Sequence, residues 1–167
     1  PDLTRIDLTR VPMAWSQALL SLAWSDANLK AGQMSGSLGV HTPASRPLRV
    51  EGSLQVSGLG LDTADGSIGA EGLGAQLQLD YRKSAGLSLV TVDGSLRGGE
   101  LLAGNAYLAL PASPATLELA ARQQGDAGWE IPQLRWDDGD ALRIEGSLAF
   151  DHTATLRDAD LRLVSAN

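Results

Sequence analysis

The side chains that could perform acid–base or nucleophilic chemistry are few, and their spacing matches no catalytic site. His41 and His152 are the only histidines. Asp151 could orient His152 as a base, but no serine lies in a G-x-S-x-G turn and no cysteine exists to be activated. Neither G-x-G-x-x-G nor G-x-x-x-x-G-K-[ST] occurs, so the glycines do not indicate a phosphate-binding loop. The sequence predicts a protein that is not an enzyme and has no cofactor.

One acidic cluster, Asp137-Asp138-Gly139-Asp140, has the composition of a calcium loop. It lacks the spaced ligands and the closing Glu of an EF-hand, so a hairpin turn is the preferred interpretation. The absence of cysteine also excludes disulfides and zinc-thiolate sites. No metal site is therefore predicted.

The tryptophans Trp15, Trp24, Trp129 and Trp136 dominate the aromatic content. Trp129 and Trp136 differ by seven positions, so in a regular strand they point to opposite faces and at least one is partly exposed. Exposed tryptophans can stack on sugars or lie at a membrane interface. The simpler alternative is that they close the ends of a core built from small residues.

Length and charge restrict the class of protein. The 167 residues fit a single domain, 1–167. A net charge of −7 argues against nucleic acid as a partner, because phosphate binding needs a concentrated basic surface. No apolar run reaches the roughly 18 residues of a membrane-spanning helix, and no signal segment is present. Since the first residue is Pro1, we expect the chain to be an excised piece of a longer protein.

A recurring five-residue phrase is the strongest structural signal. In each copy the first residue, the glycine and the leucine share one face of a strand, while the acid and the serine face the other way. A glycine on the apolar face indicates a bend or a close approach to the backbone. The copies are Val50-Glu51-Gly52-Ser53-Leu54, Val92-Asp93-Gly94-Ser95-Leu96 and Ile144-Glu145-Gly146-Ser147-Leu148, with a looser one at Met34-Ser35-Gly36-Ser37-Leu38.

The remaining pattern predicts a curved, antiparallel, all-β meander that forms an open groove. One short helix is expected over residues 12–22, and a hairpin over 23–40 with its turn at 26–28. Asp65-Gly66 predicts a tight turn between strands, and residues 87–96 and 100–110 predict a hairpin joined at Arg97-Gly98-Gly99. Later strands are expected at 116–122, 129–136, 141–150 and 155–164. The phrase glycines are unevenly spaced, which argues against a solenoid or propeller.

Three further segments accompany these strand phrases: Leu96-Arg97-Gly98-Gly99-Glu100-Leu101, the Gly-Leu-x-Leu run near residues 58–61 and the 136–148 stretch. Together they resemble the AsmA-like group of bacterial envelope proteins, which includes the TamB and YdbH relatives. The resemblance implies a periplasmic protein anchored to the inner membrane by segments absent here. It also implies a long sheet curled into an apolar groove that carries phospholipid acyl chains.

The candidate groove-lining residues are those of inward parity, whose alternative role is ordinary core. They are Leu48, Val50, Leu54, Val56, Leu77, Leu79, Leu89, Leu117, Leu119, Leu142, Ile144 and Leu148. The leading hypothesis is a non-enzymatic module that binds phospholipid acyl chains. A second is a structural component of an envelope machine, such as a secretion-system subunit, that pairs with a partner protein through sheet edges. A third is carbohydrate binding through exposed Trp129 or Trp136.

Overall fold

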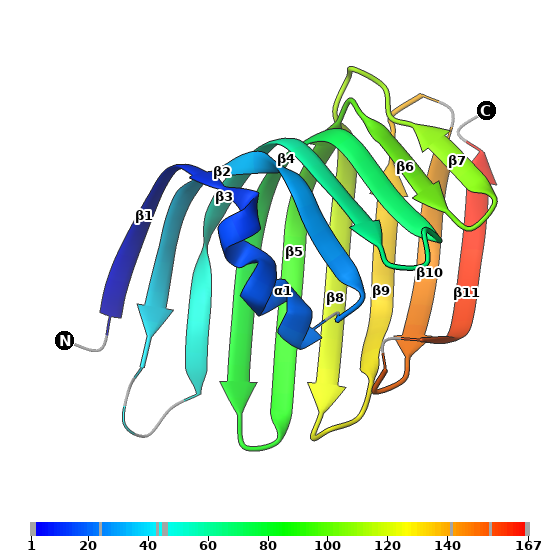
Figure 1. Cartoon of the computed structure of the whole chain (residues 1–167). Helices are drawn as coiled ribbons and strands as arrows, with labels where there is room; N and C mark the ends of the chain where they lie inside the picture. The colour runs from blue at the N-terminus through cyan, green and yellow to red at the C-terminus, as the bar shows by residue number, and fades with distance from the viewer. Residues whose placement is uncertain are drawn as a thin grey trace.

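A computed structural model describes residues 3–23, 25–42, 44, 47–140, 142–153 and 155–165. It is an open, curved antiparallel sheet, as the sequence predicts, and it has eleven strands (Figure 1). Nine strands follow the order β1-β2-β3-β4-β5-β8-β9-β10-β11, while β6 pairs with β4 and β7. The strands are β1 Leu3–Pro12, β2 Ala27–His41, β3 Leu48–Thr63, β4 Ile68–Ser84, β5 Leu87–Arg97, β6 Glu100–Ala103, β7 Ala106–Ala109, β8 Ala115–Gln124, β9 Trp129–Asp137, β10 Leu142–Phe150 and β11 Leu156–Ser165.

A line of residues with positive φ crosses the sheet where it bends. Register shifts in the β1–β2, β2–β3 and β3–β4 pairs lie beside this line. An irregularity of this kind bends a strand, and glycine tolerates the positive φ without steric cost. We call the line the crease; it consists of Arg10 in β1, Gly32 in β2, Gly58 in β3, Gly72 in β4 and the Gly98-Gly99 pair after β5.

The crease divides the sheet into two parts. Beyond it, residues 27–31, 59–63 and 68–71 continue as the upper ends of β2, β3 and β4, and together with β6 and β7 they form what we call the flap. The remaining strand segments form the wall. The flap bends over one side of the wall, at the end of the wall that holds the C-terminal strands (Figure 1). The molecule is therefore one sheet folded partly onto itself.

The buried core lies where the flap meets the wall. Leu73 of β4 and Leu110, which follows β7, are buried together with Ala115 of β8 and Trp136 of β9. Partly buried hydrophobics from the flap, including Leu101 and Leu108, and from β10, including Ile144, surround this cluster. Among the described residues no large side chain is fully buried, and only the small Ala27 and Ala115 are 0% exposed, so the core is small and shallow.

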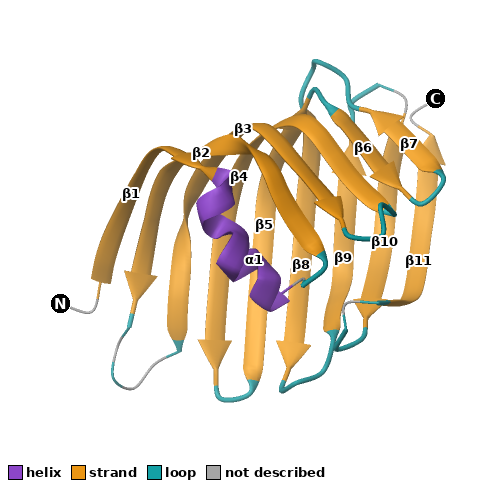
Figure 2. Cartoon of the chain, viewed as in Figure 1, coloured by secondary structure: helices purple, strands orange, loops and turns teal. Residues whose placement is uncertain are grey.

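A short helical segment closes the upper edge of β2. The 3₁₀ turn η1 (Met13–Ser16) leads into helix α1 (Gln17–Ala23), which confirms the helix expected near residues 12–22. Figure 2 shows this helix on the side of the sheet toward which the flap bends. The Gln17 Nε2 donates to the carbonyl of Ala27 at 2.8 Å, and the Leu29 N–H donates to Gln17 Oε1 at 2.7 Å. One side chain thus satisfies backbone groups that a further strand would otherwise pair.

Two of the expected hairpins are wrong. Residues 17–23 are helical, so the predicted hairpin over 23–40 is instead a helix followed by the single strand β2. Residues 87–96 and 100–110 do not pair either: β5 lies between β4 and β8, whereas Glu100–Ala103 pairs with β4 and with Ala106–Ala109. The positive φ of Gly98 and Gly99 directs the chain onto the flap rather than back along β5.

Candidate functional site

The candidate site is the face of the wall toward which the flap folds, which we call the apolar face. Successive rows of apolar residues cross it, because directly paired residues of an antiparallel sheet point to the same side. One row runs from Leu54 through Leu77, Gly94, Leu117 and Trp136 to Ile144. The next row, farther from the crease, comprises Leu38, Gly52, Leu79, Val92, Leu119, Leu134 and Gly146.

The flap covers only the part of the apolar face that is nearest to the crease. Leu96, Ala115, Trp136, Leu142 and Ile144 belong to the core cluster or pack against it. The second row is not part of this cluster, and Leu38, Leu79, Val92, Leu119 and Leu134 are only partly buried. We call these five residues the distal row. They form an apolar surface that spans β2, β4, β5, β8 and β9.

Eleven of the twelve predicted lining residues lie on the apolar face, as their register shows. Val56 is buried, whereas Leu48, Val50, Leu54, Leu77, Leu79, Leu117, Leu119, Leu142, Ile144 and Leu148 are partly buried. Leu142 and Ile144 pack against the core, so their role is structural.

Leu89 is the exception, and its prediction is wrong. It pairs with Arg82 on β4 and Arg122 on β8, on the opposite side of the sheet, and is 42% exposed. The strand β5 begins with apolar residues of both parities, Leu87, Leu89 and Val90, so alternation alone does not fix the face there. Val92, which has the parity of Gly94 and Leu96, is the β5 residue of the distal row.

Several residues of the apolar face are absent from the prediction. Leu38, Val92 and Leu134 belong to the distal row, and Leu161 and Leu163 extend the face onto β11. Parity within a strand identifies Leu38 and Val92, because each lies two positions from a phrase glycine. The flap residues that cover the face, such as Leu101 and Leu108, have no signal in local sequence because they approach from a folded-over part of the sheet.

The phrase glycines let neighbouring strands approach closely, as the sequence predicts. A Cβ added at Gly36, Gly52, Gly94 or Gly146 would overlap a backbone carbonyl oxygen of the adjacent strand, that of Ser53, Ser37, Gln76 or Asp160 respectively. Each of these four glycines also lies on the apolar face directly opposite a leucine of a neighbouring strand; in the same order, these leucines are Leu54, Leu79, Leu117 and Leu134. The recurring phrase therefore encodes a repeated close contact between strands.

The two tryptophans of β9 share one face, contrary to the prediction. An irregularity in β9 near Pro132 shifts the register against both β8 and β10. Trp129 consequently pairs with Gln123 and Trp136 with Leu117, both of which have apolar-face parity. Trp136 is 7% exposed and belongs to the core. It offers no free ring face for stacking on a sugar.

The opposite, polar face carries a charge network centred on Arg49. Its guanidinium lies 2.7 Å from Asp80 and 2.6 Å from Glu51, Asp80 also contacts Arg82 at 3.1 Å, and His41 lies 3.0 Å from Glu51. The hydrogen bonds from Arg49 and Arg82 lower the pKa of Asp80 to about 2. A hollow of about 530 Å³ beside this network is lined by polar groups including Arg5, Ser53 and Asp93. The charged groups of this network are paired with one another, and this arrangement indicates a structural role more than a catalytic one.

The acidic turns are structural as well. Asp137 accepts a hydrogen bond from the Gly139 N–H, and Asp138 accepts from Asp140 and Leu142, as expected of a hairpin turn. Asp151 accepts from Thr153 and Thr155, and these hydrogen bonds lower its pKa. Within the described residues no group of three or more acidic or histidine side chains is placed to hold a metal ion.

Among the described residues, no helix has the length and apolarity required to cross a bilayer. Comparisons with models of protein families, with curated proteins and with solved structures find no match to this chain.

Proposed function

We propose that the apolar face binds acyl chains and that the protein is a non-enzymatic lipid-handling module of the bacterial envelope. One observation carries the proposal: the wall presents a contiguous face of Leu, Val and Ala side chains, and the flap covers only the part beside the crease. A contiguous apolar surface that the rest of the fold leaves partly exposed is typical of a binding site. The resemblance to the AsmA-like group supports the same assignment.

The distal row suits a flexible hydrocarbon chain better than a shaped ligand. Leu79, Val92 and Leu119 present branched aliphatic side chains from three neighbouring strands, with no polar side chain in that row between them. Each buried CH₂ group contributes about 0.8 kcal/mol, and an aliphatic surface imposes no preference on a head group. Selectivity for one phospholipid would therefore have to come from outside this row.

The proposal is tested by lipid binding to the purified chain. Native mass spectrometry of protein isolated from bacterial cells should show bound phospholipid, and a fluorescent acyl-chain probe should bind with an affinity that the polar Leu79→Gln variant weakens about tenfold. Leu89→Gln is the matched control, because Leu89 lies on the polar face of a neighbouring strand. Circular dichroism establishes that both variants fold. Absence of lipid and of probe binding, or equal effects of the two variants, would refute the proposal.

A second candidate is an assembly component that pairs with a partner through its sheet edges. The observation that favours it is that, among the described strands, β1 and β11 at the two ends of the strand order each have only one neighbour. Such edges recruit additional strands unless they are protected. Retention of a partner by variants that no longer bind the acyl probe would favour this function over the first.

A further inference from the structure

We propose that β11 is an interface through which two copies of this chain join edge to edge, related by a two-fold axis at Leu161. In this arrangement the two sheets continue into one another, with both apolar faces on the same side. The inference does not depend on acyl-chain binding. It rests on the exposure, the charge order and the regularity of this one strand.

The apolar side chains of β11 are exposed far more than those of the inner strands. Leu161 and Leu163 point to the apolar face, opposite Gly146 and Ile144, yet they are 45% and 69% exposed. Among the described strands each has a neighbour on one side only, because β11 stands at one end of the strand order (Figure 1). A further strand beside β11 would cover them and pair its outward backbone groups.

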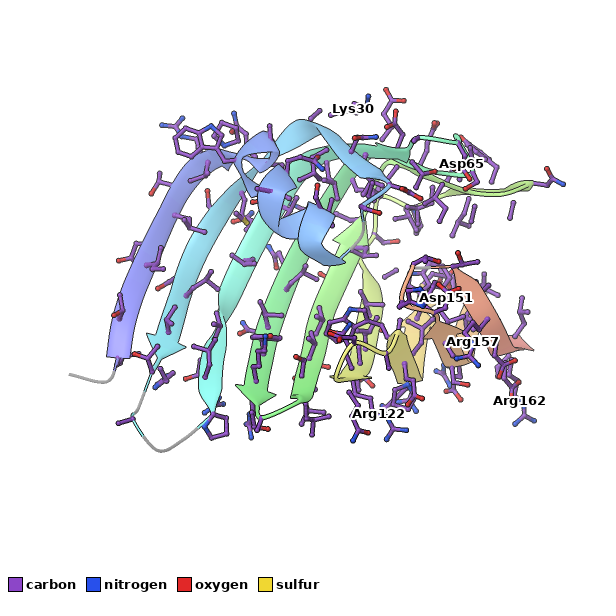
Figure 3. The ribbon with its side chains drawn as sticks, turned by 60° about the horizontal axis from the view of Figure 1, so that its bottom comes forward. Lys30, Asp65, Arg122, Asp151, Arg157 and Arg162 are labelled. Atoms are coloured by element: carbon purple, nitrogen blue, oxygen red, sulfur yellow. The ribbon has the colours of Figure 1, made fainter. Side chains whose placement is uncertain are left out.

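The charges of β11 are arranged to complement a second copy of the same strand. Asp160 and Arg162 flank Leu161 on the polar face, and neither forms an ion pair within the described residues. Figure 3 shows Arg162 directed into solvent at this end of the molecule. The acid opposite it on β10, Glu145, already contacts Arg135 at 3.3 Å.

An antiparallel pair centred on Leu161 forms two complementary pairs between Asp160 of one copy and Arg162 of the other. It places Asp160 of each copy opposite Arg162 of the other, Leu161 opposite Leu161, and Leu163 opposite Ala159. Shifting the centre by one residue in either direction would place Asp160 against Asp160 or Arg162 against Arg162, which is unfavourable. Only the register centred on Leu161 pairs both charges without a like-charge contact.

The other outer strand, β1, has a similar Arg5 and Asp7 pair but is less suited to this role. Its pairing with β2 is interrupted between Leu8 and Val11, at the crease, which leaves only a short regular segment. In β11, pairing with β10 is continuous from Asp158 to Ser165. The length of uninterrupted strand therefore favours β11, and β1 serves as the control edge.

A charge-exchange experiment tests the register directly. Multi-angle light scattering should show a dimer for the unaltered chain and monomers for Asp160→Arg and for Arg162→Asp, each of which creates two like-charge contacts. An equimolar mixture of these two variants should recover the dimer, because both cross-strand pairs become complementary again. Arg5→Asp, on β1, should remain dimeric.

Any of four results would overturn the proposal: a monomeric unaltered chain, single variants that remain dimeric, a mixture that stays monomeric, or loss of the dimer in Arg5→Asp.

Cross-linking gives a second measurement, since the chain contains no cysteine. Leu161→Cys should form an intermolecular disulfide under mild oxidation, because directly opposite residues lie within disulfide range. Leu163→Cys should not, as the two positions would be about 13 Å apart along the strands. Equal cross-linking of both variants would contradict this register.

Discussion

At the scale of single residues, the phrase glycines explain how neighbouring strands of the wall approach one another closely. Gly36, Gly52, Gly94 and Gly146 each face a backbone carbonyl of the adjacent strand with no room for a methyl group. Glycine usually weakens a strand because it contributes no side-chain packing. Its repetition at this one position of the phrase therefore indicates that strand approach outweighs the lost packing.

Gly52→Ala should lower the free energy of unfolding by about 1–3 kcal/mol, because the added methyl forces β2 and β3 apart. Gly69→Ala is the matched control. Gly69 has no positive φ, and a Cβ there would meet its nearest atom, the Leu102 Cβ, at 3.8 Å, which is an ordinary contact. Its stability should be unchanged or raised by up to about 1 kcal/mol. Urea denaturation measures both, and equal losses would contradict the close-approach explanation.

The close approach was predictable from sequence, whereas the assignment of every residue to a face was not. In the phrases, a glycine and a leucine of the same parity identify the apolar side. At Leu89 the local pattern is ambiguous, because apolar residues of both parities begin β5. At Trp129 the prediction assumes a regular strand, but the register shift near Pro132 interrupts β9. This shift places the Trp129 side chain on the same face as Trp136. Alternation predicts faces only as far as the strand continues without a bulge.

At the scale of elements, the helix matters because it ends the flap. The upper part of β2 extends beyond the crease, where β1 no longer pairs with it. The Gln17 side chain supplies both a donor and an acceptor to the backbone of Ala27 and Leu29. This explains why a short helix with no side-chain cap at its N-terminal turn is retained at this edge.

Gln17→Ala should lower the free energy of unfolding by about 1–3 kcal/mol, since it removes two hydrogen bonds to partly buried backbone groups. Exchange of the Leu29 amide proton should accelerate at the same time. Gln55→Ala is a suitable control, because Gln55 is an exposed glutamine on the polar face of the neighbouring strand β3, and it should change stability by less than about 0.5 kcal/mol. Unaltered exchange at Leu29 would argue that Gln17 does not protect this edge.

Strand positions were more predictable than strand partners. The strands at 116–122, 129–136, 141–150 and 155–164 match β8 to β11, and the Asp65-Gly66 turn connects β3 and β4. The hairpin expected between 87–96 and 100–110 fails because the same glycines that favour a tight turn also permit the chain to leave the wall. Local sequence specifies that the chain turns at Gly98-Gly99, but the neighbour that it meets afterwards depends on the extension of β4 beyond the crease.

At the scale of the whole molecule, the sheet is neither a closed sandwich nor a fully open trough. The flap seals the region around Trp136 and leaves the distal row partly exposed. The all-β character follows from the alternation, whereas the bend of the sheet lies at the positive-φ residues and register shifts of the crease. The division into covered and uncovered parts could not be predicted, because it depends on contacts between the flap and strands distant in sequence, such as the packing of Leu101 and Leu108 against the buried cluster that contains Trp136.

If the small core between flap and wall holds the two parts together, its largest side chain should dominate their stability. Trp136→Ala should lower the free energy of unfolding by about 3–5 kcal/mol, because it leaves a cavity in the buried cluster that also contains Leu73, Leu110 and Ala115. Trp15→Ala, at a side chain 77% exposed, should change it by less than about 0.5 kcal/mol. Guanidinium denaturation followed by far-ultraviolet circular dichroism measures both without relying on tryptophan fluorescence. Similar small losses in the two variants would mean that the strand pairing across the crease, rather than the core, fixes the flap against the wall.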